Sequence, residues 1–184
     1  MVRLQTTLDT WKTIRQDTIR AVEDMPAGDF DFRPADGLMT FREIARHILN
    51  AGHAMTGILL DGTTDMSGPG FRDLLKKHST EAPLDVAQLE LAAALRQAVE
   101  ERIGQLSAQD AAFFAGEITR FDGMRLTPLE MLQTIKEHEL THRSQLFMYL
   151  RLKGVVPPTT RRREAAAKAA SQGQTRTCRP AERW

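Results

Sequence analysis

The most informative segment of the chain is TPLEMLQTIKEHELTHRSQLFMYLRLKG, residues 127–154. It opens with Thr127 as an N-cap, Pro128 at the first helical position and Glu130 at the third, a combination typical of a helix start. Gly154 ends the pattern, and between these points apolar residues recur at steps of three and four. We therefore predict one long helix with one buried face. Its apolar positions include Leu132, Ile135, Leu146 and Leu150.

Three further segments carry the same helical periodicity: about Leu4–Met25, Thr40–Leu60 and Asp85–Leu106. Thr40 with Glu43 fits a capping box, and Asp85 with Gln88 three residues later marks the start of the third segment. No segment alternates as a strand does, so the predicted fold class is all-α, a four-helix bundle. In the third segment the expected buried positions are Leu89, Ala92, Leu95, Val99, Ile103 and Leu106.

The connections between these helices differ in length. Residues 61–83 form the longest irregular connection, within which Phe71–His78 is predicted as a short helix. Residues 107–126 lose the helical pattern, and Arg120–Gly123 is able to turn the chain.

The last 26 residues differ from the rest of the chain. Residues 159–184 contain seven Lys or Arg against two Glu, a net charge of +5, so the rest of the +1 chain is net −4. The segment has no Leu, Ile, Val, Met or Phe and cannot order itself by apolar burial. We therefore predict a bundle domain at 1–158 and a flexible basic tail at 159–184, transiently helical at 164–168. Cys178, in this tail, is expected to be an incidental exposed thiol.

Composition restricts the class of protein further. The chain has 184 residues, a length suited to one domain, and its single Cys cannot form an internal disulfide. No apolar run approaches the roughly 18–20 residues of a membrane span, and the first residues lack a signal-peptide core. We therefore expect a cytoplasmic protein without a membrane partner. The acidic body also lacks the basic face of a nucleic-acid-binding domain, so nucleic acid is not an expected partner.

Two histidines stand one helical turn apart in the motif His138-Glu139-Leu140-Thr141-His142. Residues four apart project from the same face of a helix, so the two imidazoles are able to share one metal ion. That face is apolar, and an unpaired imidazole is costly there. A pair of core histidines satisfied by hydrogen bonds is the alternative interpretation.

A third imidazole favours the metal. His47 lies between Ile44 and Ala51 on the buried stripe of its own helix, so it also faces inward. Three neutral imidazoles with an open coordination position are typical of a catalytic rather than a structural site. His53 lies about 240° further around the same helix and His78 lies in the irregular connection, so we expect both at the surface or at a bundle end.

The motif also matches H-E-x-x-H, the zinc-peptidase signature in which the Glu is a general base. Its extended form fails here, because Gln145 and Met148 occupy the places of the Gly and the third His. We expect Glu139 instead to make a polar contact with Arg143, its i+4 neighbour, and an acid/base role is the alternative.

These residues resemble the DinB-like (YfiT-like) family of metal-binding four-helix bundles. The resemblance rests on residues 138–145, on Tyr149-Leu150-Arg151, Gly154 and Pro157-Pro158, on the entry to the second helix from Phe32 to His47, and on Trp11. It implies a divalent metal held by His47, His138 and His142, and a homodimer. Ser144 stands where this signature commonly has Gly, and Thr141 where a further His is frequent.

The resemblance also implies a function. Characterised relatives include S-transferases and isomerases that use a low-molecular-weight thiol, which favours a metal-dependent enzyme that transfers such a thiol to an electrophilic small-molecule substrate. Gln145, one turn beyond His142, is the candidate substrate-binding residue. Two alternatives stay open: a non-catalytic binding or scaffold protein with a structural metal, and a metal-dependent hydrolase. The metal is a divalent transition ion such as Zn, Ni or Fe.

Overall fold

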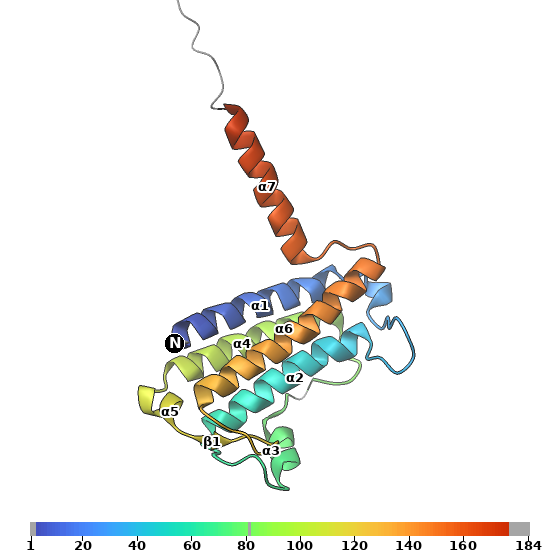
Figure 1. The fold of residues 1–184 in the computed structure, drawn as a ribbon. Helices are drawn as coiled ribbons and strands as arrows, with labels where there is room; N and C mark the ends of the chain where they lie inside the picture. The colour runs from blue at the N-terminus through green and yellow to red at the C-terminus, as the bar shows by residue number, and fades with distance from the viewer. Residues whose placement is uncertain (1–2, 81, 177–184) are drawn as a thin grey trace, which may run out of the picture.

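Four long helices form the body of the molecule (Figure 1). The computed structural model describes residues 3–80 and 82–176. Its long helices are α1 (Leu4–Asp24), α2 (Phe41–Leu60), α4 (Gln88–Ser107) and α6 (Pro128–Leu152). α1 packs against α4 and α6, and α2 packs against the same two helices, so α1 and α2 occupy opposite corners of the bundle. The predicted all-α four-helix bundle is confirmed.

The direction of each helix explains the long connection. In Figure 1, α1 and α6 run one way along the bundle, and α2 and α4 run the other way. The chain must therefore return along the whole bundle between Leu60 and Gln88. This return contains α3 (Phe71–His78), the short helix predicted from the sequence, which packs against α2.

The capping box predicted at Thr40 is present, and the helix start predicted at Thr127 is a second one. The Thr40 hydroxyl accepts from the Glu43 amide at 3.1 Å, while the Glu43 carboxylate accepts from the Thr40 amide at 2.6 Å. Thr127 and Glu130 repeat this arrangement at the start of α6, where Pro128 is the first residue. These caps set the first residue of α2 and of α6, and with it the position of each later side chain along those helices.

The prediction for the helix α4 was wrong in two details. α4 begins at Gln88 rather than Asp85, and the side-chain Nε2 atom of Gln88 donates to the Val22 and Met25 carbonyls at the end of α1, at 2.7 and 2.6 Å. Leu89, expected in the core, is exposed, whereas Leu91 is fully buried. The start of α4 is thus determined by its contact with α1, and the sequence of α4 alone does not reveal that contact.

Residues 107–126 hold two small elements beyond the predicted turn. The helix α5 (Ala111–Ala115) precedes the hairpin of β1 (Ile118–Thr119) and β2 (Arg125–Leu126), whose strands pair in antiparallel register. Two-residue strands are too short for alternation to be visible in the sequence. The 3-10 helix η1 (Ala27–Asp29) lies between α1 and α2.

The basic tail begins with a helix longer than expected. α7 (Pro158–Arg176) includes the segment 164–168 and extends away from the bundle (Figure 1). It is held near its start, where Arg161 pairs with Asp24 and Arg162 with Asp17. Cys178 lies outside the described residues. None of the described helices has the length and apolar character needed to cross a bilayer.

Candidate metal centre

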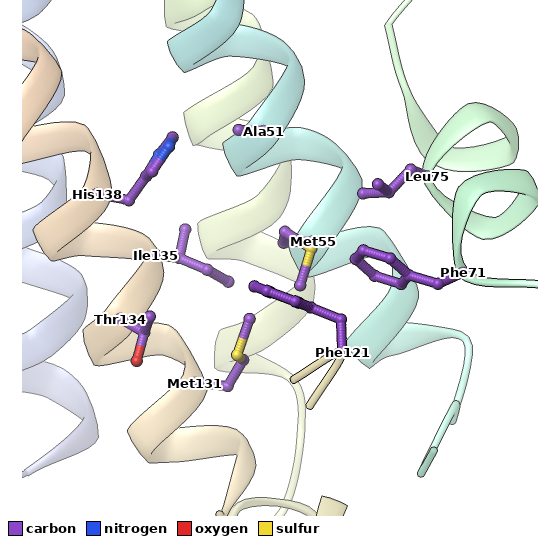
Figure 2. A pocket seen from close by; sticks show the side chains of 9 residues that line it. All are labelled: Ala51, Met55, Phe71, Leu75, Phe121, Met131, Thr134, Ile135 and His138. Atoms are coloured by element: carbon purple, nitrogen blue, oxygen red, sulfur yellow. The ribbon is translucent and has the colours of Figure 1, made fainter. Parts of the chain in front are cut away.

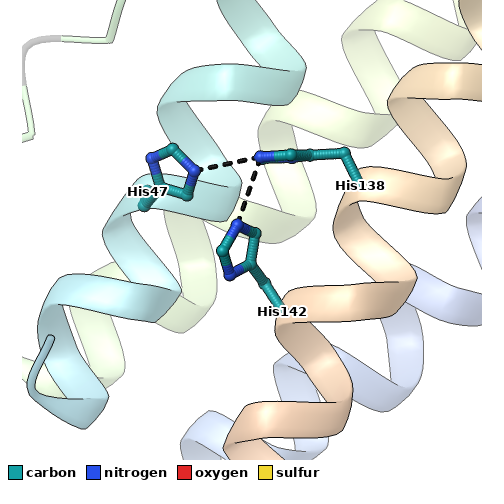
Figure 3. A group of neighbouring side chains, drawn as sticks. All are labelled: His47, His138 and His142. Atoms are coloured by element: carbon teal, nitrogen blue, oxygen red, sulfur yellow. Dashed lines mark hydrogen bonds between the residues drawn. The ribbon is translucent and has the colours of Figure 1, made fainter. Parts of the chain in front are cut away.

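The structure brings the three predicted imidazoles together between α2 and α6 (Figure 3). His138 Nε2 lies 3.1 Å from His47 Nε2 and 3.2 Å from His142 Nε2. One ring nitrogen of each residue lies within 4.8 Å of the others. We call these three residues the histidine cluster. Metal binding by the cluster stays a prediction.

Two helical positions and one facing helix build the cluster. His138 and His142 are one turn apart on α6, so both rings leave the same face. His47 comes from α2, which packs directly against α6. Ala51, the next residue on the His47 face, has a side chain too small to fill the space in front of His138, and a cavity remains there.

The cluster favours neutral imidazoles. Burial and the neighbouring His142 and His47 rings lower the pKa of His138 to about 4. Burial, together with His142, also lowers the pKa of His47 below its usual value. Deprotonated rings are the form that binds metal ions, because the ring nitrogen then offers its lone pair.

The distances test whether an ion fits. Tetrahedral bonds of about 2.0–2.1 Å place two ligand nitrogens about 3.4 Å apart, close to the 3.1 and 3.2 Å between His138 Nε2 and the other two Nε2 atoms. Hydrogen bonds alone explain the cluster less well. The Nε2 atom of a neutral His138 carries at most one proton and so donates to one partner, but two ring nitrogens lie next to it. The donor set therefore fits a divalent transition ion, and all-imidazole ligation suits Zn, Ni, Cu and Fe alike.

Gln145 contacts the cluster from outside. Its Oε1 atom lies 2.8 Å from His142 Nδ1, and its side chain is exposed. With the amide in this orientation, Nδ1 donates the proton and Nε2 keeps the lone pair that a metal requires. The structure thus places Gln145 as a residue that orients His142. Its predicted contact with substrate stays a prediction.

The predicted partner of Glu139 was wrong. Glu139 is 2% exposed and pairs with Arg15 of α1, whose Nε and Nη2 atoms donate to the two carboxylate oxygens at 2.7 and 2.9 Å. Trp11 Nε1 donates at 2.7 Å and the Thr18 hydroxyl at 3.1 Å. Arg143 pairs instead with Asp17. With both oxygens occupied, Glu139 is not available as a general base for the cluster.

The other two histidines lie outside the cluster, as expected, and both are half-buried rather than exposed. His53 is half-buried, and its Nε2 atom is 2.7 Å from Arg102 of α4. His78 is the last residue of α3. Its Nε2 atom lies 3.3 Å from Asp61 Oδ2, and its side chain packs against Gly57. Sequence reasoning placed them by their angle on α2 and by the irregular connection, and neither feature reveals that α3 and α4 cover this end of α2.

A cavity of about 270 Å³ opens beside His138 (Figure 2). The rings of Phe71 from α3 and Phe121 from the hairpin turn are stacked at its rim, with centroids 5.1 Å apart. Its lining is apolar apart from Thr134 and His138. We call it the apolar cavity, and its residues are Ala51, Met55, Phe71, Leu75, Phe121, Met131, Thr134, Ile135 and His138. Sequence analysis missed these residues as a group. The aromatic residues Phe71 and Phe121, inside polar and Gly-rich connections, were the available signal.

A four-helix bundle with a three-histidine cluster between facing helices and a cavity beside it defines a class of candidate metal-binding bundle proteins. The sequence model of the DinB family matches residues 1–176, and the chain belongs to this family. The protein YjoA of Bacillus subtilis is 26% identical over 144 residues, which cover 76% of this chain and 84% of YjoA. The predicted family resemblance is confirmed.

Solved structures show the same fold at low identity. YfiT from Bacillus subtilis, described as a probable metal-dependent hydrolase with an unusual four-helix bundle topology, has a TM-score of 0.66 at 15% identity, covering 84% of this chain and 91% of YfiT. The mycothiol-dependent maleylpyruvate isomerase has a TM-score of 0.59 at 12% identity, covering 79% of this chain and 61% of the isomerase. These likenesses concern the fold alone.

Proposed function

We propose that the chain is a metal-dependent enzyme that transfers a low-molecular-weight thiol to an electrophilic small molecule, with His47, His138 and His142 as ligands of a divalent ion. The observation that carries the proposal is the arrangement of three converging imidazole nitrogens at the edge of an apolar cavity. The thiol-dependent isomerase of similar fold supports the same chemistry.

Each residue has a defined part in this proposal. A divalent ion with three neutral ligands supplies positive charge that lowers the pKa of a thiol bound to it. The imidazoles of the cluster hold that charge in place, and Gln145 keeps the proton of His142 on Nδ1. The apolar cavity binds the electrophile and excludes water, so its reacting carbon lies near His138.

The chemistry balances without a protein base. The thiol proton leaves to solvent, the sulfur lone pair forms the new carbon–sulfur bond, and the leaving group departs with its bonding electrons. A thiol, with an ordinary pKa near 8.5, needs less help to lose its proton than water does. Among the described residues no carboxylate shares the cluster, and Glu139 is held by Arg15. The site therefore favours a thiol over water as the nucleophile, which places the hydrolase second.

Cobalt substitution tests the proposal. We expect the full chain to bind about one equivalent of Co²⁺, and added 2-mercaptoethanol to produce a sulfur-to-cobalt charge-transfer band. His47→Ala should lower Co²⁺ affinity strongly, because one of three ligands is lost. His53→Ala is the matched control: it removes an imidazole from the same helix but outside the cluster, and should keep the ion.

The outcomes separate the three functions. A bound ion whose spectrum changes neither with several thiols nor with pH contradicts the transferase and supports a structural metal. A spectrum that titrates with pH but ignores thiols supports the hydrolase, since it reports an exchangeable water. Loss of Co²⁺ binding in His53→Ala but not in His47→Ala would contradict the ligand set itself.

We also propose a homodimer, as the family resemblance implies. Leu140, Met148 and Leu152 are exposed on one face of α6 at multiples of four residues, with the small Ser144 between them. Sedimentation velocity should give the mass of two chains, and Met148→Glu should give that of one. Met124→Glu, at an exposed methionine of the hairpin, is the control that should leave the dimer intact.

A further inference from the structure

A second cavity, of about 470 Å³, reaches the histidine cluster at His47. The loop before α2 lines one side of it with Arg33, and α2 lines the other with Arg46, His47 and Asn50. We call it the polar cavity. Since His47 Nε2 and His138 Nε2 are 3.1 Å apart, the polar and apolar cavities reach the cluster at adjacent imidazoles.

Arg46 has no partner in this cavity. Its side chain is half-buried, yet it makes no hydrogen bond or ion pair with any described residue. Every other described arginine that is buried or half-buried has at least one polar partner. These are Arg15 with Glu139, Arg42 with Asp31, Arg102 with His53, Arg120 with Asp122 and Arg143 with Asp17. The N–H donors of the Arg46 guanidinium meet no acceptor among the described residues, so they are available to an acceptor from outside the chain.

The other groups of the cavity favour an anion as well. Arg33 is exposed, and its nearest carboxylate is Glu43 at 3.8 Å. Glu43 also lines the cavity, and its one negative charge offsets only one of the two guanidinium charges, so the cavity keeps a net positive charge. The side-chain oxygen of Asn50 accepts from the Thr80 hydroxyl. The Asn50 Nδ2 donors have no partner among the described residues.

From these contacts we infer that the polar cavity binds an oxyanion, a carboxylate or a phosphate, carried by the thiol cosubstrate, with Arg46 as its anchor. The inference rests on the proposed thiol transfer, and it further specifies that the thiol cosubstrate carries an anionic group. A guanidinium binds two oxygens of a carboxylate or phosphate at once, which fixes orientation as well as affinity. The thiol would thus reach the cluster from the His47 side, and the electrophile from the apolar cavity.

Three small thiols of different charge test the inference on the Co²⁺-loaded full chain. The probes are 3-mercaptopropionate, 2-mercaptoethanol and cysteamine, titrated through the charge-transfer band. We expect Arg46→Met to weaken binding of 3-mercaptopropionate about tenfold and to leave the neutral thiol within about twofold. Each thiol is compared with itself across variants, so differences between their own thiol pKa values cancel. Arg20→Met, an exposed arginine of α1, is the control with the same charge change and should have no effect.

A uniform loss across all three thiols would overturn the inference, because it would give Arg46 a merely structural role. So would an unchanged affinity for 3-mercaptopropionate. If no thiol produces a charge-transfer band in the Co²⁺-loaded chain without an amino-acid change, the proposed function fails. A second measurement then tests the polar cavity alone. Sodium propionate and inorganic phosphate should shift the amide NMR signals of Leu38 and Met39, residues of this cavity, in the unsubstituted chain and not in Arg46→Met. The anion with the larger effect identifies the oxyanion, and no shift with either anion overturns the inference.

Discussion

Glu139 is an anion inside the bundle whose two carboxylate oxygens are both hydrogen bonded. Arg15 binds both oxygens, and Trp11 and Thr18 add one donor each. The ion pair of Arg15 with Glu139 links α1 to α6 at the residue that follows His138. A buried ion pair contributes little over an apolar pair of the same shape, but removing one charge leaves the other uncompensated. Glu139 is therefore a residue of the fold, although it lies inside a sequence motif of catalysis.

Neutralising this carboxylate should destabilise the protein and leave metal binding intact. We expect Glu139→Gln to lower the free energy of unfolding by about 3 kcal/mol, because the buried Arg15 charge then lacks its counter-ion. The double variant Arg15→Met with Glu139→Met should lose less than either single change. Urea unfolding of the parent chain, of Arg15→Met, of Glu139→Met and of the double variant gives the coupling energy. Unchanged stability together with lost Co²⁺ binding would instead place Glu139 in the metal centre.

The half-buried histidines make the metal-free protein sensitive to pH. Burial lowers the pKa of His47, His53 and His138, the last to about 4, whereas unfolded histidines titrate at about 6.5. Between these values the unfolded chain binds more protons than the folded one, so stability falls as the pH decreases from about 6.5 toward 4. Urea unfolding in EDTA at about pH 7, 6 and 5 should show this decline, and His138→Gln should reduce it. A profile that stays flat over this range would contradict the prediction.

The meeting of α2, α3 and α4 depends on one glycine. A Cβ atom at Gly57 would lie 2.8 Å from His78 Nδ1, 3.0 Å from His78 Cβ and 2.9 Å from Arg102 Nη2. Arg102 cannot withdraw freely, because the same nitrogen lies 2.7 Å from His53 Nε2. Gly57 costs α2 some helix propensity, and the structure shows that the close approach of two other elements requires it.

A matched pair of glycine substitutions tests this packing. Alanine favours a helix over glycine by about 1 kcal/mol, so Gly104→Ala in α4, where nothing lies within 4 Å of the new Cβ, should stabilise the chain by up to that amount. Gly57→Ala should destabilise it by about 1 kcal/mol, since the steric cost exceeds the gain in propensity. Thermal unfolding of both variants gives the signs. Equal stabilisation by both would mean that α3 does not hold its place against α2.

The helices could be predicted because their signals are local. Thr40 with Glu43 and Thr127 with Glu130 lie within one turn, and the four-residue step from His138 to His142 fixes a shared face whatever surrounds it. In α4, Leu89 was wrongly placed on the buried face. The alanines of this helix leave unclear which side of it carries the apolar stripe. Contacts with other helices decide which side is buried, as the pairing of Arg102 with His53 illustrates.

The same distinction applies to the site. The cluster could be predicted, since His47 lies on the apolar stripe of α2 and such stripes face one another in a bundle. The partner of Glu139 could not, because Arg15 is more than a hundred residues away and Arg143 satisfies the local rule equally well. Arg15 does lie four residues after Trp11, on the buried face of α1, and a charge at such a position was the available sign of a buried pair.

The outward course of α7 defines how the tail joins the molecule. Its polar contacts with the bundle lie near its first turn: ion pairs of Arg161 with Asp24 and of Arg162 with Asp17, and a hydrogen bond from Arg151 to Thr160. Asp17 is 2% exposed, and Arg162 supplies its closest donors at 2.7 and 3.1 Å, while Arg143 remains at 3.5 Å. The first turn of α7 thus neutralises a buried carboxylate of the domain, and the later turns of this helix extend away from it (Figure 1).

Two shortened chains locate the end of the folded domain. A chain that ends at Arg163 keeps both ion pairs and should unfold at the same urea concentration as the full chain. A chain that ends at Pro158 should lose about 1 kcal/mol, because Asp17 then depends on Arg143 alone. Arg162→Gln in the chain ending at Arg163 should reproduce most of that loss, and about 1 M NaCl should diminish it, since Arg162 is half-exposed and screened by salt. Equal stability of the two shortened chains would place the boundary at Pro158 and give the ion pairs no part in the fold.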